Sequence, residues 1–225
     1  MKKMLLGVSL LSLLLLLTAC GSSSFSELGY EESTNYAAPN VSVQEIPDEP
    51  TKDELIEQIN NSNLNNIEPV VANHFHLLDS VEGEGGVANI YATKRFEVEE
   101  LATLIADVIK PSEKSDLIDN QQILIYSNHF ATFKESEEDP NTTLIEIAPK
   151  QFVRNNYAPN FLTTYFAIRL LDDVLDVDDW AKNRRAKCSN GNCYGGYSTR
   201  SSNQGGINTK RGMSSVRGGG PSAGK

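Results

Sequence analysis

The pattern of apolar and polar positions divides the chain into four parts. Residues 1–19 are almost wholly apolar after two lysines, and residues 20–50 show no sustained apolar period. Residues 51–180 contain apolar runs with the spacing of helices and strands, whereas residues 181–225 contain almost no aliphatic side chain. The pattern therefore predicts one globular domain at 51–180, preceded by a flexible tether and followed by a disordered Gly/Ser-rich tail.

The apolar spacing within residues 51–180 predicts both helices and strands. A capping box at Thr51–Glu54 predicts the start of a short helix, and apolar positions at helical spacing predict two more, at 98–109 and 159–175. Four apolar runs predict strands: 69–78, 87–93, 123–126 and 143–147. These elements do not alternate regularly. We therefore expect an α+β fold in which helices pack on one face of a small, mainly antiparallel sheet.

The amino-terminal segment is typical of an export signal. Lys2 and Lys3 precede an apolar stretch with five consecutive leucines, which is shorter than the roughly 20 residues of a comfortable membrane span. Its ending, Leu17-Thr18-Ala19-Cys20, resembles the lipobox of bacterial lipoproteins. That resemblance implies cleavage before Cys20, acylation of Cys20, and a lipid-anchored position on the extracytoplasmic face of the cell membrane. The alternative is an uncleaved helix with an incidental cysteine.

A longer set of motifs resembles an uncharacterised lipoprotein family of mainly Gram-positive bacteria, domain of unknown function forty-two forty-seven. The shared residues are Leu144–Ile147, the run 152–157, Pro159, Phe161, Leu162, Tyr165, Ile90, Tyr91, Lys110, Pro111, Ser115 and the run 217–221. The family has no established activity. The resemblance therefore implies a location and a fold neighbourhood, and it assigns no role to the acidic run 172–179.

Charge is distributed unevenly along the chain. The net charge is −10, yet residues 181–225 carry nine basic and no acidic side chains, so that the preceding domain is strongly acidic. An acidic body argues against nucleic acid as a partner. The basic tail predicts contact with anionic lipid headgroups or with an anionic cell-wall polymer.

Arg154, Asn155 and Asn156 are the candidate ligand-binding residues, because a guanidinium and two amides suit an anionic or polar ligand. In the alternative, structural interpretation, the aromatic residues around them clamp the last helix against the sheet. Arg154 then pairs with a carboxylate such as Glu146.

Three histidines, His74, His76 and His129, are weak candidates for a metal site, because two of them would share a face of the expected strand 69–78. Partly exposed strand histidines are the commoner outcome, and we expect no metal or other cofactor. The acidic run 172–179 suggests calcium only loosely, and pairing with the adjacent basic stretch is the favoured interpretation.

Cys188 and Cys193 are separated by a short polar gap, which a disulfide closes in an oxidising compartment; free thiols are the alternative. No nucleophile elbow or nucleotide-binding fingerprint occurs in the sequence, and we assign no catalytic residue. We therefore expect a binding or scaffold module with an unidentified protein partner. The alternative is a cell-envelope hydrolase that uses unassigned carboxylates or the histidines.

Overall fold

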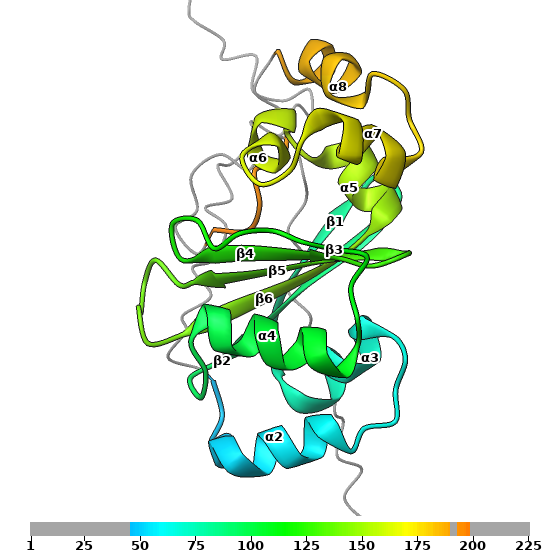
Figure 1. The fold of residues 1–225 in the computed structure, drawn as a ribbon. Coiled ribbons are helices and arrows are strands. Elements are labelled where there is room, and N and C mark those ends of the chain that lie inside the picture. Colours follow the sequence, from blue (N-terminus) through cyan, green and yellow to red (C-terminus); the bar gives the residue numbers. More distant parts are fainter. Residues whose placement is uncertain (1–45, 190–192, 199–225) are drawn as a thin grey trace, which may run out of the picture. The chain divides into compact units, whose positions relative to one another are not determined.

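The computed structural model describes residues 46–189 and 193–198. Six strands form one antiparallel sheet in the order β1-β2-β6-β5-β4-β3 (Figure 1). The strands are β1 (His76–Gly83), β2 (Gly86–Thr93), β3 (Glu113–Lys114), β4 (Gln121–Ile125), β5 (His129–Glu135) and β6 (Thr143–Pro149). The structure therefore confirms the α+β class and the antiparallel sheet.

Helices cover both faces of this sheet, and not the single face expected (Figure 1). The α2–α4 face carries α2 (Lys52–Asn60), α3 (Ile67–His74) and α4 (Val98–Val108). The α5–α8 face carries α5 (Lys150–Asn156), α6 (Pro159–Thr163), α7 (Ile168–Leu175) and α8 (Trp180–Cys188). Strand β6 shows the physical reason, because successive side chains point to opposite faces and both sets are buried.

Two apolar cores follow from this arrangement. Ile145 and Ile147 of β6 pack with Leu101 in the core beneath α2–α4. Leu144 and Ala148 of the same strand pack in the core beneath α5–α8. A one-residue step along β6 therefore moves a side chain from one core to the other.

Local signals predicted several elements correctly. The side chain of Thr51 accepts a hydrogen bond from the Glu54 amide while the Glu54 carboxylate accepts one from Thr51, which completes the capping box of α2. Gly85 and Gly86, both with positive φ, form the β1–β2 turn. Helix α4 begins at Val98 as expected.

The predicted strand at 69–78 is wrong. Residues 67–74 form α3, whose first turn contains Pro69 and is capped by the Asn66 side chain on the Glu68 amide. Ile67, Val70 and Val71 lie at helical spacing and are all buried, so this apolar run fits a helix better than a strand. Strand β1 begins only at His76.

Two further elements differ from the prediction. The polar excursion after residue 126 contains strand β5, in which Phe130, Ala131 and Phe133 are buried between hydrophilic ends. The helix expected at 159–175 is two helices, α6 and α7. Both halves bury apolar residues in the same core, so the apolar pattern runs through the break without showing it.

The expected domain boundary at residue 180 is wrong as well. Helix α8 occupies the start of the segment assigned to the tail, and residues 193–198, here called the strap, return to the α5–α8 face. Tyr194 is 0% and Tyr197 5% exposed. Their large aromatic surfaces provide the burial that a Gly/Ser-rich composition otherwise lacks. The lipobox with Cys20, the tether up to residue 45 and tail residues 199–225 lie outside the described residues.

Glycine is required at one position of the strap. Gly196 has a φ of +87°, and a Cβ at this position would lie 2.9 Å from the ring of Phe161. The strap therefore passes too close to α6 for a side chain at residue 196. Among the described residues, every helix is too short or too polar to cross a bilayer.

Candidate functional site

A buried polar cluster lies beneath the strap. Its centre is Glu146, on β6, which is 3% exposed. The Tyr157 hydroxyl donates to Glu146 Oε1 at 2.7 Å, and the Tyr197 amide donates to Oε2 at 3.1 Å. Both carboxylate oxygens are therefore satisfied by residues that come from α5's end and from the strap.

Burial dominates the electrostatics of this cluster. It raises the pKa of Glu146, an effect that the two hydrogen bonds and the charge of Lys134 oppose. The pKa values of Tyr157 and Tyr194 are raised well above their usual value by burial and by the neighbouring Glu146 carboxylate. The phenols are therefore kept neutral, and that of Tyr157 acts as a hydrogen-bond donor to Glu146.

The strap is joined to the domain by main-chain and side-chain contacts. Tyr194 exchanges backbone hydrogen bonds with the end of α5 and the residues that follow it, donating to Asn156 O at 2.8 Å and accepting from the Ala158 amide at 2.7 Å. The Tyr197 hydroxyl donates to Asp79 Oδ2 at 3.0 Å, and Lys134 Nζ donates to the Tyr197 carbonyl at 2.7 Å. The strap thus seals the cluster from solvent, which suits a structural role better than a ligand site.

Cys188 and Cys193 form a disulfide, with their Cα atoms 5.3 Å apart. The structure therefore contains the disulfide and not the free thiols that were its alternative. Arg184 supports the same corner: its Nη2 donates to Cys193 Sγ at 3.0 Å and its Nε to the Tyr157 carbonyl at 3.2 Å. The disulfide and Arg184 together fix the start of the strap against α8.

The predicted Arg154-Asn155-Asn156 triplet is not a single binding surface. Asn156 is buried and holds the β1–β2 turn: its Nδ2 donates to the Glu84 and Phe152 carbonyls and its Oδ1 accepts from the Glu84 amide. Arg154 and Asn155 are half-buried, and successive helical residues point in different directions. Within the described ranges, Glu146 is paired with tyrosines and not with Arg154.

The three histidines are also kept apart. His74 belongs to α3, where its Nδ1 lies 2.7 Å from the Val70 carbonyl, so it does not share a strand face with His76. His129 begins β5 and lies 3.4 Å from the Glu68 carboxylate. Over residues 46–189 and 193–198, no group of three His, Cys, Asp or Glu side chains is placed to hold a metal.

The acidic run 172–179 has local structural partners. The Asp172 carboxylate accepts from the Trp180 amide at 2.9 Å and so caps α8, and Asp176 pairs with Lys150 at 2.7 Å. Asp176 and Asp179 adopt positive φ and turn the chain between α7 and α8. The basic residues of α8 were expected to pair with this run, but Arg184 instead donates hydrogen bonds to the Tyr157 carbonyl and to Cys193 Sγ at the start of the strap.

An open groove of about 540 Å³ lies at the end of the sheet where β5 turns into β6. Leu117 provides exposed apolar surface, whereas Phe96 and Val98 also line the groove but are buried, and the first turn of α4 forms one wall. The charged residues that line it are the cations Lys52, Lys94 and Arg95 and the acids Glu97, Glu99, Glu100 and Glu135. The groove can therefore contact both signs of charge on a ligand.

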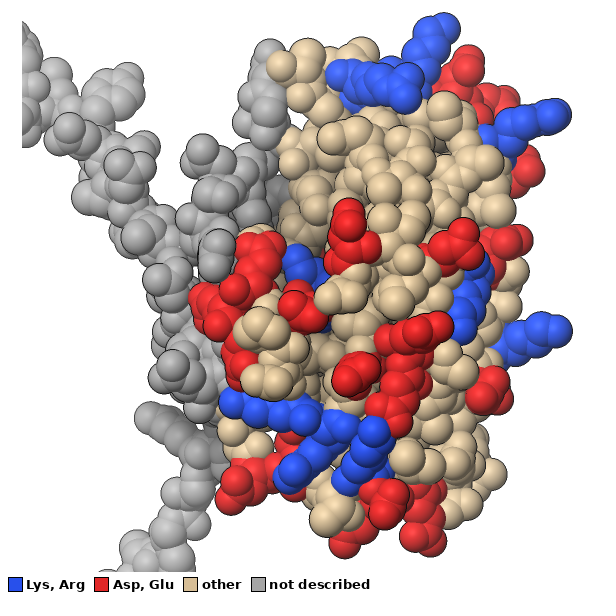
Figure 2. All heavy atoms as spheres, turned by 60° about the vertical axis from the view of Figure 1, so that its left-hand side comes forward, with Lys and Arg blue, Asp and Glu red and all other residues tan. Residues whose placement is uncertain are grey.

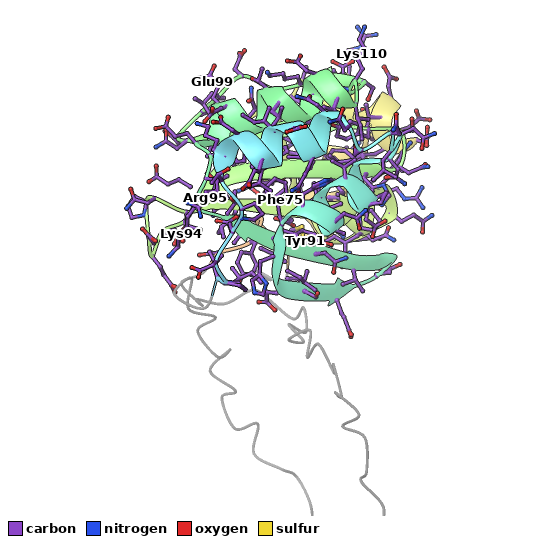
Figure 3. The ribbon with its side chains drawn as sticks, turned by 90° about the horizontal axis from the view of Figure 1, so that it is seen from below. Phe75, Tyr91, Lys94, Arg95, Glu99 and Lys110 are labelled. Atoms are coloured by element: carbon purple, nitrogen blue, oxygen red, sulfur yellow. A yellow bond between two sulfur atoms is a disulfide. The ribbon has the colours of Figure 1, made fainter. Side chains whose placement is uncertain are left out.

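Several of these charged residues already have partners in the domain. Lys52 forms an ion pair with Glu100 at 2.6 Å, and Lys94 pairs with Asp139 at 3.6 Å. Figure 2 shows basic and acidic side chains close together on this side of the molecule. In Figure 3, Lys94 and Arg95 lie together at the end of α4 that carries Glu99, whereas Lys110 is at the other end.

Neither this groove nor the role of Glu146 can be predicted from local sequence. The groove joins residues from α2, the β2–α4 loop and the β5–β6 turn, which are distant along the chain. The tyrosines of the strap were the one available signal, because two large aromatics are unusual in a glycine-rich tail. Comparisons with protein-family models, with curated proteins and with solved structures found no match.

Proposed function

We propose that this protein is a lipid-anchored, extracytoplasmic binding module, attached to the cell membrane through Cys20 and presenting the groove to a partner. The observation that carries the proposal is the Leu17–Cys20 motif directly after a short apolar stretch with two leading lysines. A lipid-modified cysteine at this place would hold the domain at the membrane surface, because two or three acyl chains anchor a protein firmly.

The disulfide gives independent support for the compartment. Disulfides persist in oxidising environments outside the cytoplasm and are rare inside it. The Cys188–Cys193 bond also belongs to the folded domain, since it fixes a strap that contributes two buried tyrosines. A protein exported by the amino-terminal signal would form this bond after translocation.

The groove supports binding as the activity. It is open, combines apolar surface with charges of both signs, and its lining is supplied by helix and strand ends that are held by the two cores. Such a surface suits a polypeptide segment that carries both charges. No observation on the described residues favours the alternative of an envelope hydrolase, which is not proposed.

Lipidation is tested by expressing the full chain in a bacterial host with labelled palmitate. We expect label in the unmodified protein and none in Cys20→Ala, together with loss of the mass difference that acylation adds to the mature protein. Cys188→Ala is the matched control, because it removes a cysteine that lies in the disulfide. Equal labelling of the unmodified protein and Cys20→Ala would contradict the anchor.

The groove is tested by photo-crosslinking in intact cells. A photoreactive residue at Leu117, which lines the groove and is 39% exposed, should capture a defined partner. The same residue at Ile168, which is 43% exposed on α7, is the control and should not. The capture should also disappear in the Lys94→Glu/Arg95→Glu variant. Identical products at both positions would mean that the groove is not the binding surface.

A further inference from the structure

The acidic side chains that line the groove differ in whether they have a partner. Glu100 pairs with Lys52 at 2.6 Å, and Glu135 accepts a hydrogen bond at 2.9 Å from a side-chain amide. Glu97 and Glu99 are exposed, and no described residue forms an ion pair or a side-chain hydrogen bond with either carboxylate. Two carboxylates of the groove are therefore available to a ligand.

The cations that line the groove are each held by an oxygen atom of the domain. Lys52 has the carboxylate partner given above. Lys94 Nζ lies 3.6 Å from a carboxylate oxygen of Asp139, and Arg95 Nη2 donates to the Glu49 carbonyl at 2.7 Å. The groove therefore attracts positive charge on a ligand more strongly than negative charge.

The charge of the surrounding domain acts in the same direction. Residues 46–189 contain 26 acidic and 13 basic side chains. A domain with this excess of negative charge raises the local concentration of cationic partners and speeds their association, and it repels anionic ones.

Leu117 gives the groove an apolar contact on a fixed backbone. Its side chain is 39% exposed and precedes a tight turn, in which Ile118 and Gln121 exchange backbone hydrogen bonds at 3.0 and 2.9 Å. Asp119 and Asn120 occupy the two positive-φ positions of this turn. Leu117 is therefore presented to a ligand without the cost of ordering a loop.

We propose that the groove binds a polypeptide segment with lysine or arginine side chains, which pair with Glu97 and Glu99 while an apolar side chain of the same segment packs on Leu117. The inference rests on the proposed function and adds to it the charge of the partner. A polypeptide fits better than a metal ion, because the described residues contain no group of three ligands placed for one. An anionic polymer is repelled by the domain.

The two free glutamates also have a structural interpretation. Glu97 and Glu99 lie at the start of α4, where the partial positive charge of the helix N-terminus favours negative side chains. On that interpretation, neutralising them lowers the stability of the domain and leaves binding unchanged. The test therefore measures both quantities.

The competing occupant of the groove is the basic segment of this chain beyond the strap. Ser198 donates to Glu137 at 3.1 Å, and Asp139 of the same turn pairs with Lys94 at the rim of the groove. A segment attached at this place would compete with a partner at a high effective concentration. The test therefore includes a variant with glutamine at its five cationic positions: Arg200, Lys210, Arg211, Arg217 and Lys225.

The test measures the fluorescence anisotropy of two labelled peptides with the purified full chain in non-ionic detergent. One peptide repeats Lys-Leu-Ser four times, and the other has glutamate in place of each lysine. The unmodified chain is compared with Glu97→Gln/Glu99→Gln. The matched control is Asp173→Asn/Asp178→Asn, which removes two exposed carboxylates that do not line the groove.

We expect the lysine peptide to bind the unmodified chain at least about threefold more tightly than Glu97→Gln/Glu99→Gln, because two ion pairs are lost in the variant. The control variant should bind it within about 1.5-fold of the unmodified chain. The glutamate peptide should bind at least about threefold more weakly than the lysine peptide. These differences should vanish near 1 M salt, where the screening length is about 3 Å.

Several results would overturn the inference. They are no binding of the lysine peptide, equal binding of the two peptides, and equal weakening in both double variants. Unchanged binding by Glu97→Gln/Glu99→Gln with a lower thermal stability would also overturn it, because the glutamates would then serve only the helix. A five-glutamine chain that binds the lysine peptide about tenfold more tightly would assign the groove to the chain's own segment and not to a partner.

Failure of the proposed function gives a different result. Photo-crosslinking from Leu117 tests whether the groove contacts a partner at all. Capture of the same partner in equal amount by the Glu97→Gln/Glu99→Gln chain would keep the groove as the binding surface and reject only the assignment of its charge. The Lys94→Glu/Arg95→Glu variant does not report the charge of the partner, because both side chains hold the wall of the groove.

Discussion

The two faces of the sheet are stabilised in different ways. The α2–α4 face is covered by helices whose buried side chains are almost all aliphatic or phenylalanine, and it draws on residues 55–147. The α5–α8 face adds a buried carboxylate with three tyrosines around it, and it is completed only by the strap. The first core depends on apolar burial alone, whereas the second also depends on buried hydrogen bonds and a covalent link.

This difference determines which substitutions should matter. An apolar core tolerates a change of shape at a cost that grows with the cavity left behind. A buried polar cluster responds strongly to the loss of one partner, because the remaining group is left without water or a hydrogen bond. The following predictions test this contrast, beginning with the largest expected effect.

Tyr194→Ala should destabilise the domain by about 3–5 kcal/mol, as expected for removing a fully buried aromatic side chain. Chemical denaturation of the purified protein measures the change. Leu101→Ala, in the opposite core, should cost about 2–5 kcal/mol, and Arg185→Ala, exposed on α8, should stay within about 0.5 kcal/mol. A Tyr194→Ala protein as stable as Arg185→Ala would show that the strap is not part of the core.

Tyr157→Phe should cost about 2–3 kcal/mol. The substitution keeps the ring packing but removes the 2.7 Å hydrogen bond to Glu146, leaving one carboxylate oxygen buried without its donor. Thermal or urea unfolding provides the measurement. Tyr165→Phe is the matched control, because this half-buried tyrosine packs in the same layer. Equal effects of the two substitutions would contradict a special role for the Glu146 bond.

Replacing both cysteines of the disulfide by serine should cost about 2 kcal/mol, because the bond closes a short loop and fixes the strap. Adding a thiol reductant to the unmodified protein should lower its free energy of unfolding by a similar amount, seen as a lower unfolding midpoint. The double variant is its own control, since the reductant should leave its midpoint unchanged. No difference between oxidised and reduced protein would mean that tyrosine burial holds the strap unaided.

Glu146→Gln should have the smallest effect, and the effect should depend on pH. Burial raises the pKa of Glu146, so its contribution to folding is fully present below the pKa of the unfolded chain and is lost as the pH rises through the raised value. Glutamine can still accept from the Tyr197 amide but has no charge to desolvate. Unfolding measured between about pH 4 and pH 8 should therefore show a flatter profile in the variant. Parallel profiles would contradict the raised pKa.

The parts of the fold that could be predicted from sequence are those governed by neighbouring residues. The capping box at Thr51, helix α4 and the glycine turn between β1 and β2 each have their cause within a few positions. The disulfide could also be proposed from the sequence, with free thiols as the alternative, because its cysteines are only five positions apart.

The remaining features depend on contacts between distant segments. Strand β5 has hydrophilic ends, and its middle is buried because β4 and β6 flank it. Glu146 looks like an ordinary surface residue within β6 until Tyr157 and the strap close over it. The groove likewise combines segments from three places in the chain. The family resemblance and the membrane location stay predictions.

The strap also sets the order in which the domain can assemble. Its tyrosines lie more than 100 residues beyond β1, yet Tyr197 donates to Asp79 in that strand. During synthesis, the α2–α4 side can form from earlier residues, while the other side stays incomplete until residue 198 has emerged. The domain is therefore expected to become resistant to proteases only after the strap has been synthesised, however early its helices form.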